Sequence, residues 1–118
     1  MRTFPAAASF LLAMLSAAAA HAHAFLDHAS PLVGGTVAAA PREVTLWFTQ
    51  GIEPAFSRVE VSDSNGARVD QGKAQVSGSI MRVGLKPLAA GTYRVHWHVL
   101  SVDTHTTQGS FTFRVGGR

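Results

Sequence analysis

The sequence contains no cysteine, which excludes a disulfide framework and any thiolate metal site. A small domain of this composition is therefore held together by packing alone. Any metal site has to use histidine, carboxylate, methionine or backbone ligands. Methionine is scarce too: Met1 and Met14 lie near the start of the chain and only Met81 follows. A site built from several soft thioether ligands is therefore excluded as well.

Charged residues are few, at 14% of the chain, and no run of one sign occurs. Ten Lys and Arg against seven Asp and Glu give a formal net charge of +3 and a pI of about 10.2. Because the basic residues are scattered, this excess does not indicate a nucleic-acid partner.

The chain has no hydrophobic run long enough to span a bilayer. Its main apolar stretch, residues 10–15, follows Arg2 and fades into alanines at residues 17–20. This pattern is typical of a secretory signal peptide. Because no second apolar stretch follows, we expect the processed protein to be soluble.

Two cleavage positions fit the preference of signal peptidases for small residues at −3 and −1. Ala20 and Ala22 favour a signal peptide of residues 1–22 and a mature chain that begins at His23. A cut two residues earlier would make His21 the first residue, and an uncleaved anchor is the third possibility.

Residues 23–118, about 100 residues, suffice for one domain with a single core. No segment has a helical period of useful length, whereas apolar and polar residues alternate repeatedly. The clearest strand is residues 92–100. The other expected strands are residues 25–29, 44–49, 58–62, 67–69, 74–76, 80–85 and 111–115.

About seven short strands in so short a chain predict an all-β, immunoglobulin-like Greek-key β-sandwich. Tyr93 opens the strongest strand behind Gly91, which is typical of the tyrosine corner of such sandwiches. The immunoglobulin cysteine pair is absent, so the likeness is one of architecture alone. A small β-barrel is the alternative.

The densest polar group, residues 101–105 (SVDTH), follows the strongest strand directly. In an extended chain Asp103 and His105 project from the same face. A carboxylate beside an imidazole can be half of a metal site or a general-base pair. It can also be an ordinary polar turn.

A chain that begins at His23 adds a second half-site, because its α-amine and imidazole can chelate one cation together. The α-amine loses its proton to a metal far more readily than a lysine does. With Asp103 and His105 the set comprises three nitrogens and one oxygen. This set suits tetragonal Cu(II), and Zn(II) would bind it more weakly.

Three stretches of the sequence carry a resemblance to a known family: HAFLDHASP at the predicted mature start, LAAGTYRVHWHVLSVDTH, and GSFTFRV near the end. They resemble the CopC family of periplasmic copper-resistance proteins over essentially all of residues 23–118. The shared pattern includes the N-terminal His, the strand with Tyr and Trp, and S-x-D-x-H followed by Gly109.

The resemblance implies a small periplasmic β domain that binds one Cu(II) per chain. By the match, His23, Asp103 and His105 take the ligand positions. The resemblance further implies an inner-membrane copper importer of the CopD type as a partner. The chain lacks the Met-rich segment of some members, and Gln50 stands where the family often has an acidic residue. We expect this amide to change copper binding only modestly.

The remaining histidines receive plainer interpretations. His96 and His98 are expected on the outward face of their strand as surface residues, with an auxiliary metal role as the alternative. His28 points with Leu26 if its strand is regular, and could then neighbour the site. Trp97 is interpreted as a packing residue that could also wall the site.

Three functions from different classes follow from these observations. The predicted one is a periplasmic copper carrier or buffer that is not an enzyme. A copper-dependent oxidative enzyme with an N-terminal His chelate is the second, although a fourth protein ligand leaves no vacant equatorial position for oxygen. A structural β-sandwich with incidental histidines is the third.

Overall fold

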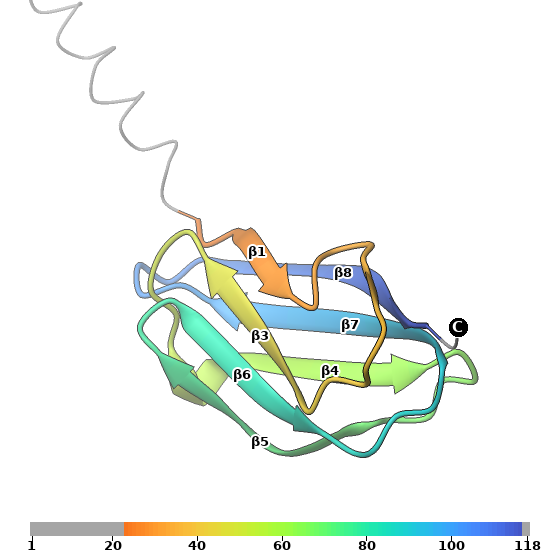
Figure 1. Ribbon diagram of the computed structural model, residues 1–118. Coiled ribbons are helices and arrows are strands. Elements are labelled where there is room, and N and C mark those ends of the chain that lie inside the picture. Colours follow the sequence, from red (N-terminus) through yellow and green to blue (C-terminus); the bar gives the residue numbers. More distant parts are fainter. Residues whose placement is uncertain (1–22, 117–118) are drawn as a thin grey trace, which may run out of the picture.

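Two facing β-sheets make up the part of the chain that the computed structural model describes, residues 23–116 (Figure 1). The predicted signal peptide, residues 1–22, and the last two residues of the predicted domain lie outside these residues. The elements are β1 (Leu26–Ser30), β2 (Thr36–Val37), β3 (Glu43–Phe48), a 3₁₀ turn (Pro54–Phe56), β4 (Arg58–Asp63), β5 (Asp70–Ser77), β6 (Ile80–Leu85), β7 (Gly91–Leu100) and β8 (Thr106–Val115).

The strand order identifies the kind of sandwich. One sheet has the order β1-β3-β6-β5 and the other β2-β8-β7-β4. If β1 and β3 to β8 are lettered A to G, the sheets read ABED and GFC, the order of constant-type immunoglobulin domains. The predicted immunoglobulin-like fold is confirmed, and it takes the form of a sandwich of two sheets.

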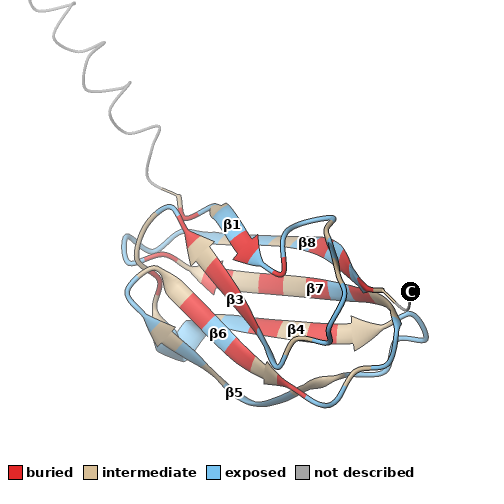
Figure 2. Ribbon diagram, viewed as in Figure 1, coloured by how far each residue is buried: buried red, intermediate tan, exposed pale blue. Residues whose placement is uncertain are grey.

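Side-chain alternation explains why the two sheets pack face to face. In β7 every second residue from Tyr93 to Val99 is buried, while His96 and His98 between them are half-buried. The buried residues of both sheets meet in one layer between them (Figure 2). Phe113 and Leu46 are fully buried there, so the core needs no covalent cross-link.

The predicted tyrosine corner is present on β7. The Tyr93 hydroxyl donates a hydrogen bond of 2.6 Å to the carbonyl oxygen of Ala89. Its ring stacks on Phe113 of β8 with 5.6 Å between ring centroids. These two contacts fix the position in the sandwich at which β7 begins. The other end of the strand, at Leu100, leads into the polar loop of residues 101–105.

Several local features differ from the prediction. β8 begins at Thr106 and not at residue 111, and β5 spans Asp70–Ser77 and not residues 74–76 alone. The two-residue strand β2 was not expected, and it pairs in parallel with β8, through Thr36 with Arg114 and Val37 with Val115. A two-residue strand has no period that a sequence could display. The segment 67–69 was expected to be a strand, but it makes only an isolated bridge between Arg68 and Ser62.

The first strand is also less regular than assumed. Leu26 pairs with Phe48 while His28 pairs with the adjacent Trp47, so a bulge interrupts the ladder at Asp27. An extra residue in one strand shifts the alternation of its side chains. The assumption of a regular strand is therefore wrong, and the His28 ring stacks on Trp47 at 4.3 Å between centroids.

Asp70, at the start of β5, joins the free edges of the two sheets, β4 and β5. The Asp70 carboxylate accepts hydrogen bonds from Arg68 Nε and Nη2 and from the Val61 N–H, each of 2.8 Å. The Arg68 hydrogen bond is the main reason why the pKa of Asp70 lies below its ordinary value. Its side chain is only 7% exposed. Asp70 thus closes the side of the sandwich where no ladder joins the sheets.

We expect Asp70→Asn to lower the free energy of unfolding by about 1.5–3 kcal/mol at pH 7, because charge-assisted hydrogen bonds are lost. A depressed native pKa stabilises the fold above the unfolded-state value near 4, and this contribution disappears as the pH falls through the native value. The difference between the two proteins should therefore be constant above about pH 5 and shrink towards pH 3. Urea unfolding at several pH values measures it; a difference independent of pH would contradict the assignment.

Candidate metal centre

The loop between β7 and β8 is a turn built on one buried serine. Ser101 is fully buried and forms a bridge with Ile52. Its N–H donates to the His105 carbonyl at 2.8 Å, and its own carbonyl accepts from the Thr104 N–H at 2.9 Å. Thr104 has φ = 75°, a left-handed conformation that is costly for a β-branched residue. The chain is therefore not extended here, contrary to the geometry we assumed from the sequence.

The turn still brings the two predicted ligands together. His105 Nδ1 lies 3.5 Å from Asp103 Oδ1. The Ser101 hydroxyl donates a short hydrogen bond to the same carboxylate oxygen and accepts one from the His105 N–H at 3.2 Å. The Ser101 bond is the main cause that holds the pKa of Asp103 below its ordinary value, and His105 adds to it. The carboxylate is thus kept ionised and oriented.

Two threonines hold the segment that starts at His23 against the sandwich. Thr49 Oγ1 donates to the His23 carbonyl at 3.3 Å and accepts from the Phe25 N–H at 2.9 Å. Thr107 Oγ1 donates to the Ala24 carbonyl at 2.6 Å, and the Ala24 side chain is fully buried. These bonds come from the end of β3 and the start of β8. They fix the backbone of His23 beside the loop.

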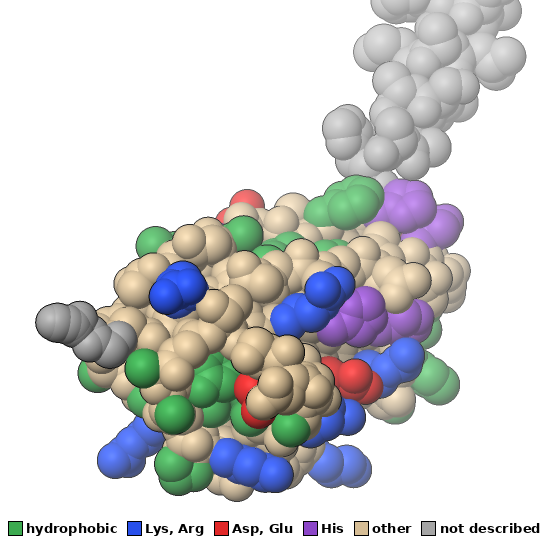
Figure 3. Space-filling view, turned by 90° about the vertical axis from the view of Figure 1, so that its right-hand side faces the viewer, with side chains coloured by type: hydrophobic (Ala, Val, Ile, Leu, Met, Phe, Trp, Pro, Cys, Tyr) green, Lys and Arg blue, Asp and Glu red, His purple; other side chains and the backbone are tan. Residues whose placement is uncertain are grey.

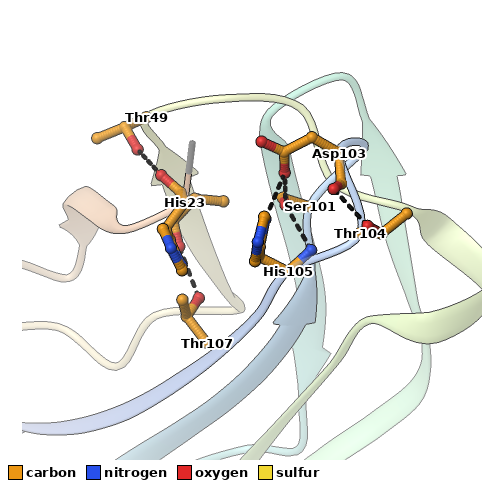
Figure 4. A network of polar contacts seen from close by, with 8 residues as sticks. His23, Thr49, Ser101, Asp103, Thr104, His105 and Thr107 are labelled. Carbon is orange, nitrogen blue, oxygen red and sulfur yellow. Dashed lines mark hydrogen bonds and ion pairs between the residues drawn. The ribbon is translucent and has the colours of Figure 1, made fainter. Parts of the chain in front are cut away.

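Figure 4 shows the His23 and His105 side chains facing each other across the gap between their segments. Their ring centroids are 4.4 Å apart, and the ring planes are inclined by 38°. The structure therefore brings together all three residues predicted as metal ligands, from segments about 80 positions apart. Both His23–His105 and Asp103–His105 are in contact.

The three side chains do not yet form a cage. Within residues 23–116 no group of three or more His, Asp or Glu side chains is arranged to hold a metal ion. The His23 nitrogen that would complete the donor set is a peptide nitrogen in this chain, joined to Ala22. An amide nitrogen with its proton is no metal ligand, so the fourth donor exists only after the bond before His23 is cut.

The other residues singled out in the sequence are placed elsewhere. The Nδ1 atom of His28 lies 2.7 Å from Asp27 Oδ2, and the His28 ring stacks on Trp47. Neither contact involves the three predicted ligands. Trp97 is buried against Phe48 with its ring edge-on at 5.2 Å, so its role is packing. Gln50 is half-buried and follows the Thr49 that holds His23.

The residues that position the ligands were missed from the sequence. Ser101 stood in the quoted S-x-D-x-H pattern without a role, and its position two residues before Asp103 was the only signal. Thr49 and Thr107 gave no signal, because they bind backbone atoms of residues 26 and 83 positions away along the chain.

Known proteins share the sequence and the fold of this chain. A family model described as the CopC domain matches residues 26–116. The chain belongs to the CopC family. This is a family of copper-resistance proteins and not of enzymes, and the match covers every strand of the sandwich.

Individual relatives cover most of this CopC chain. Protein YobA of Escherichia coli strain K12 is 38% identical over 98 residues, 80% of this chain and 79% of its own. Copper resistance protein C of Xanthomonas campestris pv. juglandis is 35% identical over 112 residues, 87% of each chain. The crystal structure of CopC from Methylosinus trichosporium OB3b superposes with a TM-score of 0.74 at 38% identity, over 79% of this chain and 93% of that one.

One relative is much longer than this CopC chain. Copper transport protein CutJ of Bacillus subtilis strain 168 is 34% identical over 99 residues, which are 80% of this chain and only 18% of CutJ. Within the described residues here, no helix is both long enough and apolar enough to cross a membrane.

Proposed function

We propose that this protein, once cut before His23, binds a single Cu(II) ion in the periplasm and carries or buffers it. The ligands are the α-amine and imidazole of His23, the Asp103 carboxylate and the His105 imidazole. The observation that carries the proposal is the contact of the His23 and His105 rings at 4.4 Å, with Asp103 3.5 Å from His105.

The donor set favours the cupric ion. Three nitrogens and one oxygen can occupy the four equatorial positions of a tetragonal centre, the geometry that Cu(II) prefers. Cuprous copper prefers sulfur ligands, and Met81 is fully buried in the core. It therefore offers no thioether to the surface loop.

The same donor set argues for transport of copper over oxidation chemistry. Oxygen activation needs an open equatorial position, and in the proposed centre Asp103 fills it. The Ser101 hydrogen bond and the nearby His105 keep this carboxylate ionised. In the proposed centre, this ionised and oriented carboxylate occupies the position on the metal that a water molecule or a substrate would otherwise take.

A membrane copper importer of the CopD type is the proposed partner. CutJ, named as a copper transport protein, contains a segment like this chain within a much longer polypeptide. Two activities that one polypeptide joins are often carried out by separate interacting chains. We infer that this protein delivers its Cu(II) to such an importer.

The chain contains two aspartate–histidine pairs, Asp103–His105 and Asp27–His28, and comparing them tests the proposed site. Asp103→Ala should weaken Cu(II) binding by more than about 10–100-fold, the range for losing a residue that only supports a ligand. Asp27→Ala removes a carboxylate that is more exposed, at 61% against 37% for Asp103, and that also pairs with a histidine, His28; it should leave the affinity unchanged. Electron paramagnetic resonance of the unaltered protein should show one tetragonal centre with nitrogen and oxygen ligands.

Competition with a copper chelator measures both variants, and circular dichroism checks that each is folded. Equal affinity in Asp103→Ala and the unaltered chain would remove the loop from the site. An equal loss in both variants would indicate binding to surface charge and not to a built site.

A further inference from the structure

A second pair of histidines lies on the outer face of the sheet that contains β7. His96 and His98 flank the buried Trp97, so both side chains leave the strand on the same side. Two positions along a strand correspond to about 6.6–6.8 Å, a span over which two imidazoles can converge on one ion with bonds near 2.0 Å. Histidine side chains gather on one side of the molecule, next to basic and acidic side chains (Figure 3).

His96 is held as a metal ligand usually is. Its Nδ1 makes a hydrogen bond of 2.9 Å with the Ser110 hydroxyl, which lies opposite it on β8. When Nδ1 carries the proton and donates it to Ser110, the lone pair is on Nε2. A hydrogen bond of this kind fixes the tautomer and the ring orientation of metal-binding histidines.

His98 is incompletely satisfied by the fold. Its Nδ1 is buried and has no hydrogen-bond partner among the described residues. Its Nε2 also has no partner there and is not buried, so it is open to a ligand from solvent. Gln108, opposite His98 on β8, carries an amide oxygen that can accept the Nδ1 proton when Nε2 binds a cation.

Glu60 of β4 lies opposite His96 and supplies a carboxylate to the same face. Its Oε2 is 3.7 Å from Arg68 Nη1, too long for a hydrogen bond, whereas Arg68 makes two bonds of 2.8 Å to Asp70. This long ion pair holds Glu60 only weakly, so its side chain can turn towards the histidines. It must turn, since the described residues contain no preformed group of three ligands.

Positive charge surrounds the pair and sets its strength. Arg58 lies opposite His98, and Arg94 precedes His96 by two positions on the same face. Both guanidinium groups repel a divalent cation, which makes this site weaker than a site without such neighbours.

We propose that His96 and His98, with Glu60 as a third donor, bind a second divalent transition-metal ion, Zn(II) or Cu(II). Its three ligands come from β4 and β7, and the residues that orient the rings come from β8. The site therefore does not require a free amine at His23, nor does it use the loop at residues 101–105.

Zn(II) titration calorimetry on the chain that starts at His23 tests the site, with His105→Ala as a background in which the loop centre is weakened. In the His105→Ala protein, the weaker of the two Zn(II) binding events should persist. It should lose at least about tenfold in affinity in His96→Gln and in His98→Gln. His28→Gln removes a histidine of β1 that lies outside this site, and it should leave the affinity of the weaker site unchanged.

Two charge variants should have opposite effects on Zn(II) affinity at this site. Glu60→Gln should weaken binding severalfold, and Arg58→Gln should strengthen it. A nuclear magnetic resonance titration of the unaltered chain should place the Zn(II)-induced shifts on β7 around the two histidines, which makes the test independent of how well any variant folds. Full retention of the weaker binding event in His98→Gln, or an equal loss in His28→Gln, would overturn the assignment.

Discussion

Replacing His105 by Ala should reduce Cu(II) affinity more than about 100-fold in a chain that begins at His23, beyond the range typical of losing a supporting residue. The same substitution should be nearly silent in a chain that begins at His21. In the proposed centre of the first chain, the amine and the imidazole of His23 share one ion with the loop. The two added residues, His21 and Ala22, remove the amine from that arrangement.

The longer chain still binds copper, by another route. A histidine at position three behind a free amine can bind Cu(II) together with its own deprotonated backbone amides. This square-planar site is local and needs no fold. A simple binding assay would therefore not distinguish the two chains. A double-mutant cycle that combines the two chain starts, His21 and His23, with His105→Ala measures directly how the N-terminus and the loop are coupled in copper binding.

Denaturant separates the two kinds of site further. The chain that begins at His23 should lose its copper on unfolding, because only the fold joins ligands about 80 positions apart. The chain that begins at His21 should keep its copper in denaturant. Mass spectrometry of secreted material then shows which chain is produced. Equal sensitivity of both chains to His105→Ala would show that the processed N-terminus and the loop bind different ions.

Gly109→Ala should be strongly destabilising, by about 3 kcal/mol or more, because it overpacks the core. A Cβ atom at Gly109 would lie 2.6 Å from Trp97 Cζ2 and 2.9 Å from Cε2. The two residues face each other across the β7–β8 ladder, and Phe48 packs edge-on against the Trp97 ring. Phe48 therefore restricts how far the ring can move away from a methyl group at position 109. In a domain of this size the melting temperature should fall by roughly 10–20 °C.

Gly84→Ala on β6 is the matched control. Its Cβ would meet only Gln71, at an ordinary 3.5 Å, so stability should change by less than about 1 kcal/mol. Combining Gly109→Ala with Trp97→Leu should destabilise less than the sum of the single changes, since the smaller side chain makes room for the methyl group. Strict additivity, or a harmless Gly109→Ala, would contradict the packing account.

The strands that could be predicted are those whose alternation is long enough to show one buried face. The predicted strand at residues 80–85 coincides with β6, and β7 was placed correctly apart from one residue at its start. The two residues of β2 show no such pattern, because their strand character comes from pairing with β8. The bulge at Asp27 likewise depends on the register against β3. Neither feature can be read from its own segment.

The candidate site likewise has one part that the local sequence indicates and another that only the fold determines. Asp103 and His105 form a local pattern, and the resemblance to a known family connected them with His23. The burial of Ser101, which orients both loop ligands, depends on its bridge to Ile52 about 50 positions earlier. The tethers from Thr49 and Thr107 are equally non-local. Local sequence therefore indicated the candidate donor atoms, and only the fold reveals what holds them in place.

The tethers of Thr49 and Thr107 have a practical consequence for recombinant work. Both bonds are made to backbone carbonyl oxygens, those of His23 and Ala24, and neither uses the His23 nitrogen, so an N-terminal affinity tag should leave them intact. Such a tag would nevertheless convert the amine into an amide. A tagged preparation would then look native by circular dichroism and give a misleading copper affinity. Tags belong beyond Val115, because β8 carries the chain about 30 Å from Thr106 to its far end.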